Sequence, residues 1–410
     1  MSTERNSSAL VARPGHVPEE LVVEFDMYNV PGGDKDAQGA FAAVQRTSPN
    51  IFWTPYNGGH WVATRAADVE AMLRDPEAFS SQRVFIPRDD SAPRTLPLES
   101  DPPVHTQMRR PLTLGLMSKA IDAMEHNVRD LAVELIESFL ARGECDFMAE
   151  FANVLPMEIF LDLVNLPRAE RTRLVPIVEN FIKGGTVEAR QQAQLEIMAY
   201  ISGVVEERRS APGEDLGSKV VNATVDGERI SDDVALSYMT LLLFGGLDTI
   251  ASMLGFITRF LAESPGHRKQ LVDNLENRDF VRAAMEEMFR RFGIVNSGRV
   301  ITRDCEFSGV QFRSNDTILP INLLAGLDEQ KVSDPLAVDF TRGSPSNHLA
   351  FGTGPHSCPG ATLARREIYI FLQEWLGRIP EFSVRKGAPP VAVTGVTCSL
   401  QSLRLEWPVD

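Results

Sequence analysis

Apolar residues recur every three or four positions through most of the chain, which is the spacing of amphipathic helices. We predict helices in four such segments: 66–78, 119–141, 147–165 and 189–209. The first should stop at the Asp-Pro turn at 75–76. Short runs that read as strands lie at 60–65, 306–312 and 401–407. Gly and Pro gather in the predicted loops 86–103, 210–217, 334–360 and 387–395. The pattern predicts a mainly α protein with small β-sheets.

The most apolar segment is 234–262, which is long enough to span a bilayer. Asp248 lies near its middle, where an ionised group would be costly in lipid, and no second apolar segment accompanies it. Ser231 and the two aspartates after it resemble an ordinary helix start. We therefore predict a long helix in the core of a soluble protein.

The middle of this segment breaks the usual rules of helix composition. Each of Gly245 and Gly246 costs about 1 kcal/mol relative to alanine. Asp248 and Thr249 need hydrogen-bond partners if they are buried. Two interpretations remain equally open: a kink with a satisfied aspartate, or a functional site that needs space and protons.

Composition and charge narrow the classes of protein. The 410 residues are 43% hydrophobic and 24% charged, which permits a sizeable core. The net charge of −15 argues against attraction to nucleic acid or to an anionic membrane surface. The polar N-terminus has no apolar stretch of a signal or anchor, so we expect residues 1–20 to be a flexible arm and the protein to be cytoplasmic. No break resembles a linker, so 21–410 is expected to be one domain.

The cysteines Cys145, Cys305, Cys358 and Cys398 are widely spaced, which argues against a disulfide framework. Cys358 differs from the others because it ends the glycine-rich segment 351–360, FGTGPHSCPG, and a helical pattern follows at once. A thiolate there would lie near a helix N-terminus, where amide groups and the helix dipole stabilise negative charge. Such surroundings suit a thiolate ligand of iron.

Other interpretations of this segment meet specific objections. A dinucleotide fingerprint would need a third glycine where Ser357 stands. A zinc site would need more ligands than His356 and Cys358. A nucleophilic cysteine beside His356 is conceivable but lacks an evident triad. A buried small apolar side chain is the ordinary role of a lone cysteine, and it suits the other three better.

FGTGPHSCPG resembles the haem-binding loop of the cytochrome P-450 superfamily. Further segments agree in order: EEMFRR, with Glu287 and Arg290, resembles the Glu-x-x-Arg pair of the K helix, and 246–249 resembles the oxygen-binding stretch of the I helix. DPPVHTQMRR at 101–110 is similar to the start of the C helix. The resemblance covers essentially the whole chain and is closest to the bacterial camphor hydroxylases. It implies the P-450 fold, a single-domain helical triangular prism.

The resemblance also implies haem b (iron protoporphyrin IX) with Cys358 as the metal ligand and O2 as co-substrate. Phe351 would shield the sulfur side of the porphyrin, and Gly245, Gly352 and Gly360 would lie against the cofactor. The haem propionates would be bound by charged and imidazole donors: His105, Arg109, Arg299 and His356. Family members often have an aspartate two residues before that arginine, whereas this chain has Ser297.

Asp248 and Thr249 are the predicted catalytic residues, because a hydroxyl above the iron can hold a proton donor and a nearby carboxyl can supply protons. Glu287 and Arg290 resemble a structural ion pair, with Arg342 as a third member. Removal of one partner would leave a buried charge and cost about 3–5 kcal/mol.

The resemblance places six residues around the substrate pocket: Phe85, Thr95, Leu241, Phe244, Val295 and Val396. A mostly apolar lining favours a small hydrophobic substrate. Camphor hydroxylases use a tyrosine in the segment corresponding to 89–100, and no tyrosine occurs there; Arg94 or Thr95 would be the nearest donor. We therefore predict a terpenoid or norisoprenoid substrate, such as an ionone-like ring ketone, in place of camphor.

The chain has no flavin or iron–sulfur domain, so electrons must come from a partner. The resemblance implies a [2Fe–2S] ferredoxin with an NADH-dependent ferredoxin reductase, acting on a monomer. Four arginines could form a docking patch: Arg109, Arg110, Arg365 and Arg366.

Two other functions stay open. A peroxide-driven haem peroxygenase would not need Asp248 and Thr249, and a non-catalytic haem protein or gas sensor should lack the oxygen-activating helix.

Overall fold

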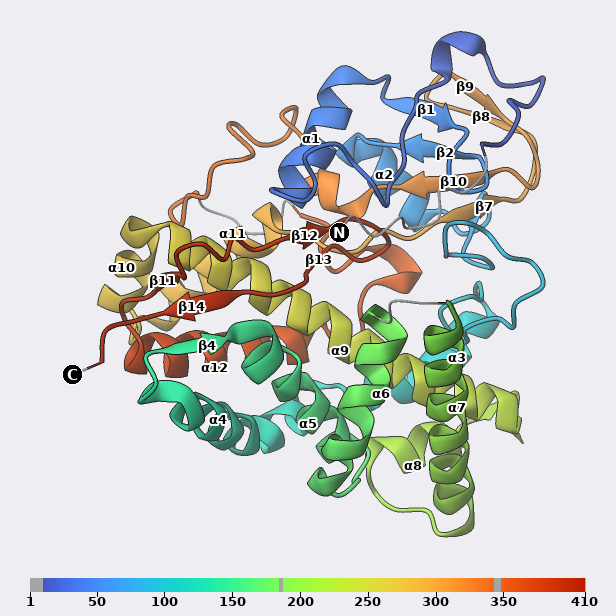
Figure 1. Cartoon of the computed structure of the whole chain (residues 1–410). Coiled ribbons are helices and arrows are strands. Elements are labelled where there is room, and N and C mark those ends of the chain that lie inside the picture. Colours follow the sequence, from blue (N-terminus) through green and yellow to red (C-terminus); the bar gives the residue numbers. More distant parts are fainter. Residues whose placement is uncertain (1–9, 184–186, 343–347, 410) are drawn as a thin grey trace.

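The computed structural model describes residues 10–183, 187–342 and 348–409, and their helices dominate the molecule (Figure 1). The helices are α1 (Ala37–Thr47), α2 (Ala66–Arg74), α3 (Val104–Gly115), α4 (Ser118–Leu140), α5 (Val154–Leu163), α6 (Arg171–Lys183), α7 (Val187–Ser210), α8 (Leu216–Val221), α9 (Asp232–Glu263), α10 (Pro265–Asp273), α11 (Arg278–Arg291) and α12 (Ala361–Arg378). The prediction of a mainly α protein with small sheets is confirmed.

The largest sheet joins strands from distant parts of the chain. Its order is β1 (Ile51–Thr54), β2 (His60–Ala63), β10 (Thr317–Pro320), β7 (Arg299–Ile301) and β3 (Phe79–Ser80). Strand β10 runs parallel to β2, and the other neighbours are antiparallel. The smaller sheets combine β4 (Glu144–Asp146) with β14 (Arg404–Glu406) and β11 (Ser383–Val384), β5 (Thr224–Val225) with β6 (Glu228–Arg229), β8 (Cys305–Phe307) with β9 (Val310–Phe312), and β12 (Ala392–Val393) with β13 (Ser399–Leu400).

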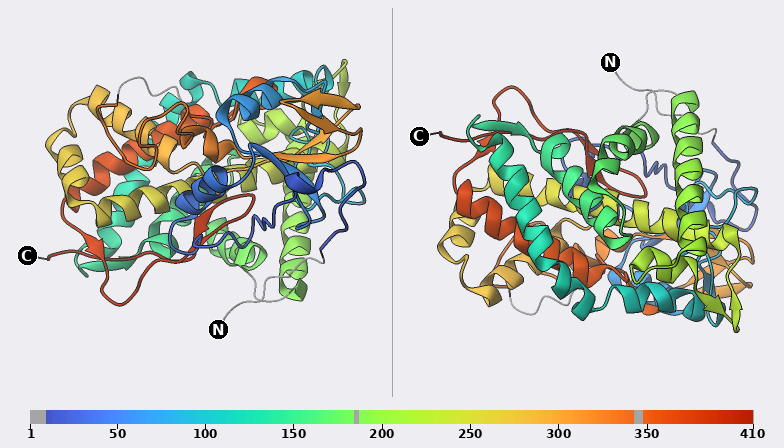
Figure 2. Two further views of the ribbon diagram at one scale, coloured as in Figure 1. Left: turned by 90° about the horizontal axis from the view of Figure 1, so that it is seen from above. Right: turned by 90° about the horizontal axis from the view of Figure 1, so that it is seen from below.

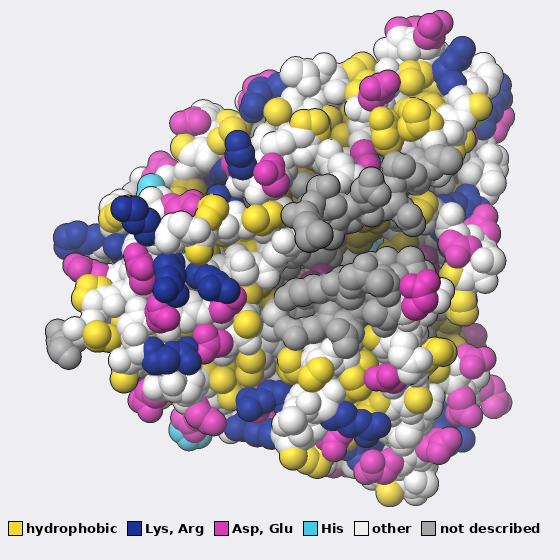
Figure 3. Space-filling view, in the orientation of Figure 1, with side chains coloured by type: hydrophobic (Ala, Val, Ile, Leu, Met, Phe, Trp, Pro, Cys, Tyr) yellow, Lys and Arg dark blue, Asp and Glu magenta, His cyan; other side chains and the backbone are white. Residues whose placement is uncertain are grey.

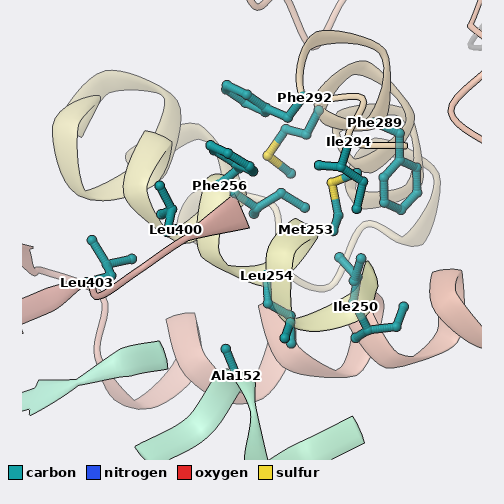
Figure 4. Packing of buried hydrophobic residues seen from close by; sticks show 14 of the residues in the cluster. Ala152, Ile250, Met253, Leu254, Phe256, Phe289, Phe292, Ile294, Leu400 and Leu403 are labelled. Atoms are coloured by element: carbon teal, nitrogen blue, oxygen red, sulfur yellow. The ribbon is translucent and has the colours of Figure 1, made fainter. Parts of the chain in front are cut away.

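Helix α9 passes through the middle of the molecule, as the views from above and below also show (Figure 2). Ser231 caps its N-terminus by accepting the amide hydrogen of Val234. Its C-terminal half packs Met253 and Phe256 toward Phe292 and Ile294 (Figure 4). By length and composition alone α9 could cross a membrane, but more than half of its most apolar window is buried here, as in a core helix. The helix continues through Gly245 and Gly246 without a break in its assignment.

Three predicted elements differ in detail from the structure. The segment 147–165 divides into a π-helical turn over Met148–Ala152 and then α5. The run 306–312 is a hairpin of β8 and β9, because Ser308 and Gly309 at its turn both have positive φ. Helix α2 ends at Arg74, directly before the predicted Asp-Pro turn.

The N-terminal segment contacts the sheet from the first described residues. The Val11 amide donates to the Pro55 carbonyl at 2.9 Å, and Val17 is 1% exposed in the cluster around Trp61. Residues 1–9 of the predicted arm lie outside the described residues. The described residues from Leu10 onward thus contact the protein at Val11 and Val17.

Candidate active site

The loop that carries Cys358 is folded back on itself by backbone hydrogen bonds. The Cys358 amide donates to the Phe351 carbonyl at 2.8 Å, and the Gly352 amide donates to the Leu349 carbonyl at 2.9 Å. Gly354 has φ +69°, and a Cβ there would lie 2.5 Å from the carbonyl oxygen of Leu73 on α2. Only glycine fits this contact. The loop is thus fixed against α2 just before α12 begins.

The thiol of Cys358 has mixed surroundings. Burial among protein atoms raises its pKa, while the backbone amide of Gly360 and the charges of Arg109 and Arg365 lower it. Cys358 as a whole residue is nevertheless exposed to solvent. Donors and cations that favour the thiolate fit a cysteine that ligates iron.

Open space also borders the middle of α9. Gly245 and Gly246 are exposed although their helix is central, and a Cβ on Gly246 would meet nothing within 4 Å. The next turn presents Thr249, whose hydroxyl donates to the Gly245 carbonyl at 2.7 Å. Leu241, Gly245 and Thr249 are four residues apart and therefore share one face of the helix. Asp248 is also engaged in an interaction with its surroundings.

Four basic side chains from three parts of the fold converge beside the cysteine loop. His105 and Arg109 are one turn apart on α3, Arg299 lies in β7, and His356 comes from the loop. The rings of His105 and His356 have centroids 3.9 Å apart. Burial, together with the charges of His105, Arg299 and Arg109, lowers the pKa of His356 to about 3. Burial and Arg109 likewise lower the pKa of His105 to about 4.

This basic cluster contains buried donors without partners. In the described part of the chain, neither Nδ1 of His105 nor Nε2 of His356 has a hydrogen-bond partner. Arg299 is 4% exposed, and burial lowers its pKa to about 10. Its Nη1 donates to the Gly298 carbonyl at 2.7 Å and to the Ser297 hydroxyl at 3.1 Å. Desolvated cations and unpaired imidazole nitrogens fit a pair of carboxylates, which haem propionates would provide.

The predicted pocket residues come from adjacent segments. Val295 forms a β-bridge with Thr397, beside Val396, and the Gly298 amide donates to the Val84 carbonyl at 2.7 Å. Val295, Val396 and Phe85 therefore lie in neighbouring stretches, while Leu241 and Phe244 belong to α9. Phe85 is 44% exposed. The Thr95 amide donates to the Glu99 carboxylate at 2.7 Å.

The predicted docking patch is partly neutralised within the protein. Arg365 forms an ion pair with Glu286, and Arg366 forms ion pairs with Glu125 and Asp122. Arg109 donates to the carbonyl of Ser357. Among the described residues, Arg110 is exposed and makes no ion pair. Figure 3 shows basic and acidic side chains intermingled on the face it presents.

Sequence reasoning missed a charged network directly below Phe351. The guanidinium carbon of Arg365 lies 4.3 Å from the centre of the Phe351 ring. Glu286 accepts from Arg365 Nη2 at 3.0 Å and lies 3.0 Å from Nε2 of His348, and despite its burial its pKa falls to about 2 because of these partners. The adjacent pair of glutamates in the segment EEMFRR was the available signal, since two neighbouring acids on a helix need separate partners.

Glu287 and Arg290 form a buried, two-pronged ion pair in α11. Arg290 Nε donates to Glu287 Oε2 at 2.7 Å and Nη2 donates to Oε1 at 2.8 Å. Arg342 Nε donates to the same carboxylate at 3.1 Å, and the Asp339 amide donates at 2.9 Å. Arg290 also bonds the carbonyls of Gly326, Pro335 and Ala337, each at 2.7 Å. The network joins α11 to the chain that leads to the cysteine loop.

Known proteins agree with this architecture. The family model for cytochrome P450 matches residues 156–390. "Probable cytochrome P450 127A1" of Sinorhizobium fredii is 34% identical over 404 residues, covering 96% of each chain. The methyl-branched lipid omega-hydroxylase of Mycobacterium tuberculosis is 30% identical, covering 91% of this chain and 92% of that protein. The crystal structures of CYP101J2 and CYP101C1 match with TM-scores of 0.89 and 0.88, at 36% and 34% identity, covering 98% and 97% of this chain and 100% of each of theirs.

The fold and the cysteine loop together define a haem-thiolate oxygenase. The chain belongs to the cytochrome P450 family and is a bacterial-type P450 monooxygenase that uses haem and O2. Its structural neighbours include members of the CYP101 group.

Proposed function

We propose that Cys358 is the axial ligand of the haem in a monooxygenase that hydroxylates a small hydrophobic substrate. The observation that carries the proposal is the accessible sulfur of Cys358 beside a basic cluster with unpaired buried donors. Haem bound to a cysteine thiolate supplies oxygen binding and cleavage of the oxygen–oxygen bond. The protein's own residues bind the cofactor, exclude water and move protons.

His105, Arg109, Arg299 and His356 would hold the two propionates. Arg299 is the buried anchor, and the Ser297 hydroxyl oxygen accepts one hydrogen bond from it where the family commonly has an aspartate. A serine brings no negative charge, so the propionates would be the main anions that the cluster meets. We expect Phe351, Gly352 and Gly360 to cover the sulfur side, and Gly245 to leave room on the other side.

Thr249 and Asp248 would control protons on the side opposite Cys358. The Thr249 hydroxyl is already oriented by its bond to the Gly245 carbonyl, so its oxygen can accept a hydrogen bond from water. Asp248 would supply protons to that water. The Glu287–Arg290 pair and Arg342 would act on folding and haem retention alone.

The substrate would be a terpenoid or norisoprenoid, such as an ionone-like ring ketone. Phe85, Leu241, Phe244, Val295 and Val396 are apolar, which supports a small hydrophobic ligand. The named relatives include enzymes of methyl-branched lipids and of steroids, which are also hydrophobic compounds. A panel of terpenoids and norisoprenoids, screened by the shift in haem spin state, tests the proposal; no response to any norisoprenoid would reject it.

A [2Fe–2S] ferredoxin with an NADH-dependent reductase would deliver electrons to a cytoplasmic monomer. The docking surface would centre on Arg109 and Arg110, since Arg365 and Arg366 already have acidic partners. A pocket of about 650 Å³ opens below Phe351, and Arg278 and Arg282 on its rim add positive charge. Residues 21–410 would act as one domain in this reaction.

The absorption spectrum of the reduced carbon monoxide complex tests the central assignment. The wild-type protein should show the red-shifted band of a thiolate ligand, and Cys358→Ser should lose both the band and substrate oxygenation. Cys145→Ser is the matched control, because burial places that thiol in the core. Turnover with the reductase system but little with peroxide separates the proposal from a peroxygenase or a gas sensor.

A further inference from the structure

The segment between β3 and α3 forms a loop whose two ends are joined by hydrogen bonds to one buried carboxylate. Glu99 is 2% exposed, and its carboxylate accepts the amide of Val84 at 3.1 Å and the amide of Thr95 at 2.7 Å. Farther along the loop, Arg88 donates to the carbonyl and side-chain oxygens of Asn315 at 3.1 and 2.8 Å. Residues 84–99, which we call the pocket loop, are therefore closed at their base by Glu99 and joined through Arg88 to the chain just before β10.

One side chain joins the pocket loop to α9. The Leu96 amide donates to the Ser237 hydroxyl oxygen at 2.6 Å, and that hydroxyl donates to the Leu96 carbonyl at 3.0 Å. A single hydroxyl thus satisfies both backbone groups of Leu96. Among the residues that the structure describes, these are the hydrogen bonds that connect the pocket loop with α9.

Ser237 stands on α9 about three turns before the candidate catalytic group Thr249. Ser237 lies one turn before Leu241, a predicted pocket residue, so these two side chains are neighbours on the helix surface. Ser237 is about 18 Å from Thr249 along the axis, at 1.5 Å per residue. The pocket loop also contains Phe85 and contacts the segment beside Val295 through the bond from Gly298 to Val84. The loop therefore closes the gap between α9 and the β7 side of the site.

We propose that Ser237 is a positioning residue that holds the pocket loop against α9 and so sets how long a small molecule stays in the distal pocket. This inference rests on the proposed function, because it requires the space beside Thr249 to be the pocket. When the loop lifts, the two backbone groups of Leu96 can bond water instead, so opening costs only the net strength of these hydrogen bonds. Net values near 1 kcal/mol per bond correspond to about a fivefold change in the open population for one bond.

The experiment compares Ser237→Ala with Ser237→Thr in the haem-loaded protein. Hydrogen–deuterium exchange of the peptide containing Leu96 reports loop opening. The dissociation rate of 4-phenylimidazole, an iron ligand with an apolar ring, reports escape from the pocket without knowledge of the substrate. We expect Ser237→Ala to raise both rates by at least about fivefold, since it removes both bonds to Leu96. Ser237→Thr keeps the hydroxyl and should restore both rates.

Thr240→Val is the matched control. The Thr240 hydroxyl donates at 2.8 Å to the Leu236 carbonyl within α9, so its loss removes a hydroxyl from the same helix without affecting the loop. Equal rates in Ser237→Ala and Thr240→Val would overturn the proposal. So would a failure of Ser237→Thr to restore the wild-type rates, since the effect would then come from packing.

The wild-type protein provides a test that does not depend on a stable variant. The Leu96 amide should exchange at least about tenfold more slowly than in an unstructured peptide, and exchange at the peptide rate would overturn the proposal. If the reduced carbon monoxide complex of the wild-type protein lacked the red-shifted band of a thiolate ligand, the haem assignment would be rejected instead. The two failures are therefore distinguishable.

Discussion

Charged and polar groups have partners on one side of the site and lack them on the other. On the Cys358 side, charged groups have partners within the chain: Glu287 with Arg290, Glu286 with Arg365, and Arg366 with Asp122. At the edge where the propionates would bind, His105 and His356 are buried with unpaired nitrogens. These ion pairs are thus satisfied within the folded chain, whereas the buried nitrogens of the basic cluster would gain partners from bound anions.

This difference separates what supports the fold from what binds the cofactor. Completed ion pairs keep the cysteine loop and α12 in place before haem arrives. The basic cluster keeps desolvated cations close together, which disfavours their charged forms until carboxylates enter. Variants on the first side should therefore change the free energy of unfolding, and variants on the second side should change haem affinity or chemistry.

The largest expected effect on stability is at Arg290. Arg290→Gln would leave the Glu287 carboxylate buried with less compensation and should lower the free energy of unfolding by about 3–5 kcal/mol. Denaturant unfolding measures the loss. Arg385→Gln is the control, because Arg385 forms a 2.9 Å ion pair with Glu144 at the surface and should lose less than about 1 kcal/mol. Equal losses in the two variants would contradict the structural role of the Arg290 pair.

On the opposite side, Thr249→Ala should leave folding intact and change the chemistry. The variant removes a hydroxyl that donates only within α9, so the unfolding midpoint should barely move. Hydroxylated product per O2 consumed should fall, by up to about a hundredfold if the hydroxyl organises general acid catalysis. Simultaneous measurement of oxygen uptake and product tests this, with Thr240→Val as control. Wild-type yield from Thr249→Ala would remove Thr249 from the proton path.

Replacement of Glu367 should change the free energy of unfolding less than replacement of Arg290, and should raise it. It is buried on α12, its Oε2 has no partner in the described chain, and burial raises its pKa to about 8. The folded state therefore favours the protonated acid, so its contribution to stability is greatest below the unfolded pKa near 4.3 and falls as pH rises toward 8. Glu367→Gln mimics the protonated form and should gain about 2 kcal/mol at pH 8. At pH 4 the gain should disappear, as thermal unfolding at the two values can show; an equal gain at both would contradict this account.

The sequence predicted those structural features well that depend on residues near one another in the chain. The long apolar run and its serine–aspartate start located α9, and the glycines around Cys358 marked a loop whose tight contacts the structure shows, such as Gly354 against Leu73. These features follow from residues near one another in the chain. The order of the sheet strands, which pairs β2 with β10, depends on segments some 250 residues apart and left no local pattern.

Side-chain partners were harder to predict for the same reason. Arg365 and Arg366 are adjacent and were both assigned to a docking patch, yet the fold gives each a different acid, from α11 and from α4. Ser237 is an unremarkable serine in a helical pattern, and only the tertiary structure places Leu96 against it. Convergence of His105, Arg299 and His356 was predicted from the family resemblance, since no spacing in the chain encodes it.

The smallest predicted effect concerns Arg110, which differs from its neighbours on the Cys358 side because it is exposed and makes no ion pair among the described residues. An exposed charge contributes to association rates through long-range attraction and little to stability. Arg110→Glu should slow reduction by a [2Fe–2S] ferredoxin several-fold at low salt, with convergence toward wild type as salt rises, and leave the unfolding midpoint unchanged. Arg366→Glu should differ, because it breaks ion pairs with α4 and so lowers stability as well. Unchanged reduction kinetics in Arg110→Glu at low salt would remove Arg110 from the docking surface.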